Sequence, residues 1–123
     1  MTREQMKART KNYAKRIVKL CEALPDKWVA RTLGKQLLRS GTSVGANYRA
    51  VCRAKSTADF LNKLRIVEEE CDESLFWMEL LVECSLIKSA RLNSLMQEAN
   101  ELLSIVVASA KTTRTSTERR TGS

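Results

Sequence analysis

Apolar side chains recur at the three- and four-residue spacing of a helix in four successive stretches of the chain. The first stretch predicts a helix over 6–24, which Pro25 ends. Asp26 is the expected N-cap of a second helix, which runs over 26–54. The two apolar stripes are Met6, Tyr13, Ile17, Leu20, Cys21 and Leu24 in the first helix, and Val29, Leu33, Leu37, Val44, Tyr48 and Val51 in the second.

The third helix is predicted to begin at Ser56, because Ser56 followed three residues later by Asp59 resembles a capping box. Its apolar surface is the widest in the chain, which indicates a central position in the fold. A break over 85–89 precedes a fourth helix, with Ser89 as its expected cap. The inward positions of these two helices are Phe60, Leu64, Val67, Cys71, Leu75, Met78 and Val82, then Leu92, Leu95, Met96, Ala99, Leu102, Leu103 and Val106.

Four helices with short connections predict an all-α fold, an antiparallel up-down four-helix bundle over residues 1–110. The remaining residues, 111–123, contain no apolar side chain, and we expect them to form a disordered basic tail. Gly41 and Gly45 interrupt the second stripe beside Ser40. Glycine is costly inside a helix, so this segment indicates either a close approach of another helix or a local bend.

Several functional classes are excluded by what the chain lacks. No apolar run approaches the roughly 20 residues that span a bilayer, and the basic N-terminus has no apolar core of a signal peptide, so we expect a cytoplasmic protein with no membrane contact. The chain has no histidine and no phosphate-binding glycine loop. We therefore expect no enzyme activity, no catalytic residue, no metal, no cofactor and no small-molecule substrate.

The four cysteines and the acidic cluster in the third helix do not change this expectation. We interpret Cys21, Cys71 and Cys84 as small core residues, and Cys52, which lies among arginines and lysines, as a half-buried thiol. The acidic cluster lacks the histidines that accompany glutamates in metal-binding bundles. It consists of Glu68, Glu69, Glu70, Asp72 and Glu73.

Charge is distributed unevenly along a chain whose formal net charge is +8. Residues 1–56 hold 14 Lys or Arg and 3 Asp or Glu. Residues 57–86 hold 2 Lys or Arg and 8 Asp or Glu. Basic side chains recur every four residues in two acid-free rows, which are Lys7, Lys11, Lys15 and Lys19, then Lys27, Arg31, Lys35 and Arg39. Like charges at this spacing destabilise a helix by about 0.2–0.5 kcal/mol per pair, so a partner that favours the rows is expected.

A nucleic acid is the leading candidate for that partner, because each neutralised phosphate releases a condensed counterion. The chain has few aromatic residues, so we expect contacts with the RNA or DNA backbone rather than base stacking. The candidate phosphate-binding residues are Lys7, Lys11, Lys15, Arg16, Lys35, Arg49, Arg53 and Lys55. Two other interpretations remain open: a solvated face that aids solubility, and a surface that meets the acidic third helix of another subunit.

Residues 39–48, which read RSGTSVGANY, resemble the R-S-x-x-S-V-x-A-N signature of the bacterial four helix bundle protein family. The resemblance continues through Glu73, Trp77 and Leu80 and covers about residues 10–107. The family includes the protein encoded by intervening sequences in 23S rRNA genes and the accessory variability determinant, Avd, of diversity-generating retroelements. The second part of the signature is carried by Lys55, Ser56, Asp59, Phe60, Lys63, Leu64 and Ile66.

This resemblance implies a non-catalytic four-helix bundle that assembles into a homopentameric ring. For Avd-type members it implies a basic surface that binds nucleic acid and a partner reverse transcriptase. The chain departs from the family where an acid and a glycine often follow the signature, because Ala50 and Val51 occur there instead and Arg53 follows them. The second helix is therefore more basic at its end. The subgroup of the family that the chain resembles, and hence its partner, is left open.

The polar residues of the signature lie on or beside the buried stripe of the second helix, where polar groups need hydrogen-bond partners. We expect Asn47 or Ser43 to share one structural network with Glu73, joined by Arg39 and Ser40. The favoured role of this network is to fix the helix register, ahead of direct ligand binding. The sequence is compatible with two functions: a nucleic-acid-binding accessory protein, and a homo-oligomeric protein-interaction module without a nucleic-acid role.

Overall fold

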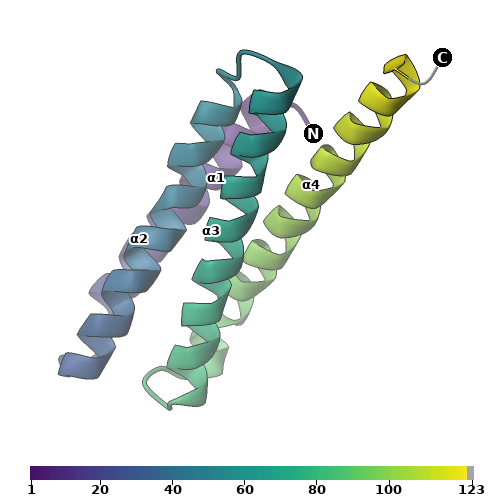
Figure 1. Ribbon diagram of the computed structural model, residues 1–123. Coiled ribbons are helices and arrows are strands. Elements are labelled where there is room, and N and C mark those ends of the chain that lie inside the picture. The colour runs from purple at the N-terminus through teal and green to yellow at the C-terminus, as the bar shows by residue number, and fades with distance from the viewer. Residues whose placement is uncertain (122–123) are drawn as a thin grey trace.

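The computed structural model describes residues 1–121, and within them it contains four α-helices and no strand. They are α1 (Arg3–Glu22), α2 (Trp28–Val51), α3 (Thr57–Glu83) and α4 (Ser89–Thr121). Consecutive helices run antiparallel, and α3 lies between α2 and α4 (Figure 1). This arrangement confirms the predicted four-helix bundle. Among the described residues, none of the helices combines the length and apolar content needed to cross a bilayer.

The packing between helices is unequal. Helix α2 packs closely on both α1 and α3, and α3 packs on α4, whereas α1 touches α4 only sparsely. Figure 1 shows α4 diverging from the other helices toward its C-terminal end. The core is a single cluster to which all four helices contribute, and its fully buried side chains include Tyr13, Ile17, Leu37, Val44, Leu64, Met78, Leu81, Leu92 and Leu102.

The predicted starts of the later helices can be compared with the structure. Helix α4 begins at Ser89, which is therefore its first helical residue and not its cap. The hydroxyl of Ser56 accepts the Asp59 N–H at 3.1 Å, so the predicted cap of α3 is confirmed. The prediction for α2 is wrong, because its N-cap is Lys27, which makes no side-chain cap. Asp26 instead pairs with Arg31, one turn into the helix. Its carboxylate is therefore held by a cation rather than by the free N–H groups of the first turn.

The start of α1 contains a cap that the apolar pattern does not indicate. The Thr2 hydroxyl accepts the Gln5 N–H at 3.1 Å, and the Gln5 side chain accepts the Thr2 N–H at 2.8 Å. This is a reciprocal capping box, which satisfies two backbone donors that the first turn of a helix leaves unpaired. As a result α1 begins three residues earlier than its apolar stripe indicates.

The turn from α3 to α4 requires an unusual backbone conformation. Ser85 has a φ of 58°, in the left-handed region. The Leu86 N–H donates to the Leu81 carbonyl at 2.9 Å and the Ser85 N–H to the Val82 carbonyl at 3.0 Å, which is the Schellman pattern of helix termination. Cys84 is exposed just after the last turn of α3, so its assignment to the core is wrong. Cys71 is buried as predicted.

The glycines of α2 mark a close approach to α1 and not a local bend. A Cβ atom on Gly41 would lie 2.7 Å from Cγ1 of Ile17, and one on Gly45 would lie 3.1 Å from the carbonyl oxygen of Thr10. Side chains at these positions would push the two helices apart. The small residues therefore let α1 and α2 meet at the level of their backbones.

The expectation of a disordered tail over 111–123 is corrected by the structure, in which α4 continues through Thr121. Residues 122 and 123 lie outside the described residues. The hydroxyls of Thr113, Thr115 and Thr117 each donate to the carbonyl four residues earlier, at 2.9–3.0 Å. A helix nucleated by its packed part propagates without apolar side chains, and no proline or glycine stops it before Gly122.

Candidate nucleic-acid interface

A groove of about 540 Å³ follows the outer seam between α1 and α2. Small side chains form its floor, because Gly45 and the neighbouring alanines allow the two helices to approach closely. Basic side chains stand on both sides of this floor, Lys7 and Lys11 from α1 and Arg49 from α2. The full lining, which we call the α1/α2 groove, is Glu4, Lys7, Ala8, Lys11, Ala14, Thr42, Gly45, Ala46 and Arg49.

The basic seam extends in both directions from this groove. Lys15 lies one turn beyond Lys11 and is exposed, so helical geometry places it on the same side of α1. A second hollow, of about 350 Å³, continues along the seam toward the α1–α2 turn and is lined in part by Arg31 and Lys35. Arg53 follows Arg49 by one turn, just after the end of α2.

Little carboxylate charge neutralises these side chains within the molecule. Lys7 pairs with Glu4 at 3.5 Å, and that carboxylate is largely exposed. Within residues 1–121, no ion pair involves Lys11, Lys15 or Lys35, and Arg49 likewise has none. The α1 row thus remains cationic toward solvent, whereas two members of the α2 row are paired, Arg31 with Asp26 and Arg39 with the acidic residues of α3.

Two of the predicted phosphate ligands lie elsewhere. The Arg16 guanidinium donates to the Ser94 hydroxyl on α4 at 2.9 Å, so it faces the opposite side of α1. Lys55 lines a separate hollow of about 340 Å³ at the start of α3, together with Arg3 and Thr113. The structure therefore gathers five of the eight predicted residues along one seam, Lys7, Lys11, Lys15, Lys35 and Arg49, and Arg53 lies just beyond the end of α2.

The predicted polar network is present only around Glu73. The Arg39 guanidinium donates to the carboxylates of Glu73 and Glu70, the latter at 3.0 Å, and the Trp77 indole N–H donates to Glu73 at 3.4 Å. The hydrogen bond from Arg39 is the main reason that the pKa of Glu73 lies below its ordinary value. This cluster fixes α2 against α3.

The other signature residues do not join that cluster, so this part of the prediction is wrong. The Ser40 hydroxyl donates to the Gln36 carbonyl at 2.9 Å, and the Asn47 amide donates to the Ser43 carbonyl at 2.8 Å. Each therefore satisfies its hydrogen-bonding group within α2 itself. Short polar side chains in a helix commonly use the carbonyl one turn back, which is closer than any group on a neighbouring helix.

Two contacts between distant helices have no signal in the sequence. The Tyr13 hydroxyl on α1 lies 2.8 Å from the Ser74 hydroxyl on α3, and both side chains are fully buried. Arg9 on α1 pairs with Glu98 on α4 across a gap of 89 residues in sequence. Nothing in the local pattern of either stretch indicates its partner.

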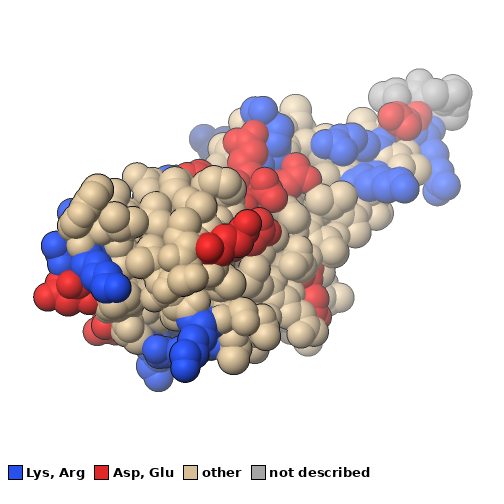
Figure 2. Space-filling view, turned by 90° about the horizontal axis from the view of Figure 1, so that it is seen from below, with Lys and Arg blue, Asp and Glu red and all other residues tan. Residues whose placement is uncertain are grey.

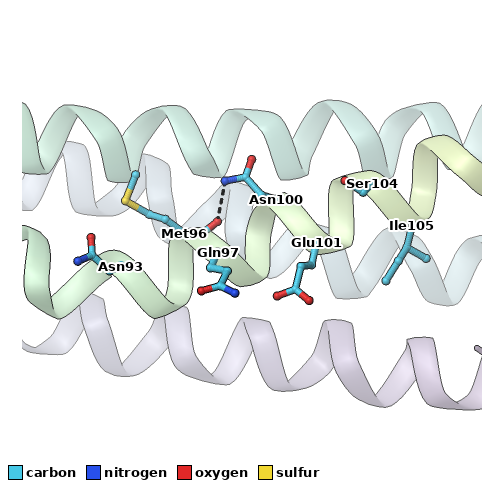
Figure 3. A pocket seen from close by; sticks show the side chains of 7 residues that line it. All are labelled: Asn93, Met96, Gln97, Asn100, Glu101, Ser104 and Ile105. Atoms are coloured by element: carbon cyan, nitrogen blue, oxygen red, sulfur yellow. Dashed lines mark hydrogen bonds between the residues drawn. The ribbon is translucent and has the colours of Figure 1, made fainter.

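Another hollow, of about 620 Å³, belongs to the outer face of α4 (Figure 3). Its lining comes from this single helix, with Met96 and Asn100 directed toward α3 and Gln97 and Glu101 toward α1. One helix cannot enclose a ligand, and this face offers amides with one carboxylate. In residues 1–121, no three Cys, Asp or Glu side chains are grouped closely enough to hold a metal ion.

Comparison with known proteins identifies relatives of this fold. The model of the 23S rRNA-intervening sequence protein family matches residues 4–108. The chain is similar to a crystal structure of a protein of unknown function from the S23 ribosomal protein family of Bacteroides thetaiotaomicron VPI-5482, with 35% identity and a TM-score of 0.84 over 90% of this chain and 99% of that one. No curated protein matches. The chain belongs to the family of 23S rRNA-intervening sequence proteins.

Proposed function

We propose that this protein is a non-catalytic nucleic-acid-binding accessory protein that holds a phosphate backbone along the α1/α2 groove. The observation that carries the proposal is the position of Lys7, Lys11 and Arg49 on both sides of one groove with a floor of small residues. Phosphates that enter this groove release counterions, and a single exposed carboxylate, that of Glu4, opposes them.

The same geometry favours contacts with phosphates over contacts with bases. Residues four apart in a helix rise by about 6 Å, so Lys7, Lys11 and Lys15 form a row of evenly spaced charges. The lining of the groove contains no aromatic side chain on which a base could stack. Binding is therefore expected to be salt-sensitive and weakly sequence-specific.

A gel-shift or anisotropy titration with structured RNA over a range of salt concentrations tests the proposal. The test variant combines Lys7→Gln, Lys11→Gln and Arg49→Gln. The matched control removes three positive charges at the opposite end of the bundle, through Lys27→Gln, Lys88→Gln and Arg91→Gln. We expect the groove variant to lower the slope of log K against log salt by about 3, about 1 for each lost phosphate contact.

The control distinguishes binding in the groove from a general effect of net charge on affinity. If both triple variants weaken binding equally, net charge alone drives the interaction and the groove has no special role. If the unchanged protein fails to bind RNA or DNA even at low salt, the proposed function is overturned.

A homo-oligomeric protein-interaction module is the second candidate, and an exposed phenylalanine beside a partly buried tryptophan favours it. Phe76 is 53% exposed and contacts Trp77 edge to face, with ring centroids 5.0 Å apart, beside the Arg39–Glu73 cluster. Trp and Arg are the residues most often found at the energetic centre of protein interfaces. The family resemblance implies a homopentamer. Light scattering of the wild type and of Phe76→Ser tests whether the subunits contact each other through this face.

A reverse transcriptase is the narrower proposal for a protein partner, and the resemblance to Avd supports it. The genomic neighbourhood discriminates between the two family contexts. A reverse-transcriptase gene with a template repeat beside this gene supports the retroelement role. A position inside a 23S rRNA gene contradicts that role and supports an intervening-sequence context.

A further inference from the structure

The last turns of α4 extend beyond the packed bundle. The last fully packed core residue of α4 is Val106, and the family model ends at residue 108, yet the helix continues through Thr121. Residues 111–121, which we call the arm, rise by roughly 16 Å along the helix axis. Figure 1 shows this end of α4 standing apart from the other three helices. The arm is therefore an addition to the family bundle rather than part of its core.

The arm has the composition of a polyanion-binding element. Its charged residues are Lys111, Arg114, Glu118, Arg119 and Arg120, and it has no apolar side chain over 111–120. Figure 2 shows these basic side chains gathered on the extension of α4 that recedes from the bundle. A surface without apolar groups offers nothing to a hydrophobic protein interface, whereas clustered cations attract phosphates.

The arm starts at the same end of the bundle as the basic end of the α1/α2 groove. Thr113, near its beginning, lines one hollow together with Arg3 and Lys55. Because the helices alternate in direction, the start of α1 and the end of α2, which carry Lys7 and Arg49, also lie at this end. A nucleic acid that leaves the groove at this end passes Arg3 and Lys55 before it reaches the arm.

The conformation of the arm also favours a partner. Threonine is a weak helix former, so the helical form of the arm depends on the packed part of α4 that nucleates it. Three threonine hydroxyls of the arm donate to carbonyls of the same helix, which leaves the cations as its recognition groups. Phosphates bound to Lys111 and Arg114, which are three residues apart on the helix, would relieve the repulsion between these two cations and stabilise the helical arm.

We infer that the arm makes a second set of phosphate contacts on the same nucleic acid that the α1/α2 groove binds. This inference rests on the proposed function, because it extends the bound backbone from the groove across the end of the bundle. The arm lies beyond the groove, so it contacts long nucleic acids and does not reach short ones held in the groove.

The experiment compares a long structured RNA with an oligonucleotide of roughly six nucleotides, a length within the site size of a small binding groove. The arm variant carries Lys111→Gln, Arg114→Gln and Arg119→Gln in the full chain, and the groove variant described above is its matched control. We expect the arm variant to lose at least tenfold in affinity for the long RNA, with a salt slope lower by about 3, and to bind the oligonucleotide like the wild type. The groove variant loses affinity for both.

Each alternative outcome contradicts a specific statement. If the arm variant binds long RNA with unchanged affinity and salt slope, the arm is only a solvated helix end, while the proposed function stands. An equal loss on both lengths overturns the second contact, because the arm would then act on the groove site itself. Failure of the wild type to bind either probe removes the proposed function and the arm together.

Discussion

The guanidinium of Arg9 on α1 donates two hydrogen bonds to the carboxylate of Glu98 on α4, Nε to Oε2 at 2.8 Å and Nη2 to Oε1 at 2.7 Å. The hydrogen bond that Arg9 donates to this carboxylate is the main reason that the pKa of Arg9 is raised. Because α1 and α4 otherwise touch sparsely, the pair closes the side of the bundle that apolar packing leaves open.

Arg9→Met is expected to lower the free energy of unfolding by about 1–2 kcal/mol, because the partly buried Glu98 loses a bidentate, charge-assisted partner. Urea denaturation followed by circular dichroism measures the change. Arg65→Met is the control, since the Arg65–Glu69 pair is exposed and its loss should cost under about 0.5 kcal/mol. Equal effects of the two substitutions would show that the Arg9 pair has no special role in closing the bundle.

The buried Tyr13–Ser74 pair should respond asymmetrically to mutation. Ser74 donates to the Cys71 carbonyl at 2.7 Å, so Tyr13 is the donor in the bond between the two hydroxyls. Ser74→Ala leaves the tyrosine hydroxyl buried without a partner and should cost about 2 kcal/mol. Tyr13→Phe leaves Ser74 still bonded to Cys71 and should cost about 1 kcal/mol. Urea denaturation ranks the two, and a greater cost for Tyr13→Phe would contradict this donor assignment.

Gly41→Ala should destabilise the protein, although alanine is the better helix former. The new methyl group would meet Ile17, which is fully buried and has no room to move, at a cost of about 1–3 kcal/mol. Gly34→Ala is the matched substitution, because its methyl group would meet only Cδ1 at the flexible end of Leu24. Thermal melting should show a large drop for Gly41→Ala and a small change for Gly34→Ala. Similar melting temperatures would mean that α1 and α2 are not in tight contact at Gly41.

Stability should fall as pH rises above about 9, the ordinary pKa of a cysteine thiol. Burial raises the pKa of Cys71 to about 12, and it also raises the pKa of Tyr13. The folded state thus holds these protons after the unfolded state has released them, so stability is complete below pH 9 and is lost between pH 9 and 12. Each such group contributes a slope of about 1.4 kcal/mol per pH unit within its range.

Cys71→Ala tests this interpretation, with urea midpoints measured from pH 8 to pH 11. The substitution costs some stability at pH 8 through the space it leaves, but the decline above pH 9 should become shallower. An unchanged slope would assign the alkaline loss to other groups.

The two thiols at opposite extremes of exposure should differ in reactivity. Cys84 is exposed after the end of α3, whereas Cys71 is buried and donates to the Ala99 carbonyl at 3.3 Å. A thiol reagent at neutral pH should modify Cys84 first and reach Cys71 only as the protein unfolds. Mass spectrometry of peptides over a time course identifies the order, and early labelling of Cys71 would contradict the packing of the core.

Much of the secondary structure is determined locally. The helical spacing of apolar residues predicts all four helices, and Ser56 marks the start of α3 because a hydroxyl before the first turn has free N–H groups to accept. The basic row on α1 is likewise visible in the sequence, since residues four apart share a face whatever the helix packs against. The length of α4 is not predicted, because helix propagation past residue 110 depends on a nucleus supplied by the packed core.

The tertiary structure decides which rows belong together. A periodic pattern defines the faces of one helix but not its rotation against a neighbour, so the sequence places Lys35 and Arg39 in one row while the bundle separates them. The close contact at Gly45 creates the groove between Lys11 and Arg49, and the pairing of Arg9 with Glu98 joins residues 89 positions apart. These relationships arise only when four helices share one core, because the packing of that core sets the orientation of every outward-facing side chain.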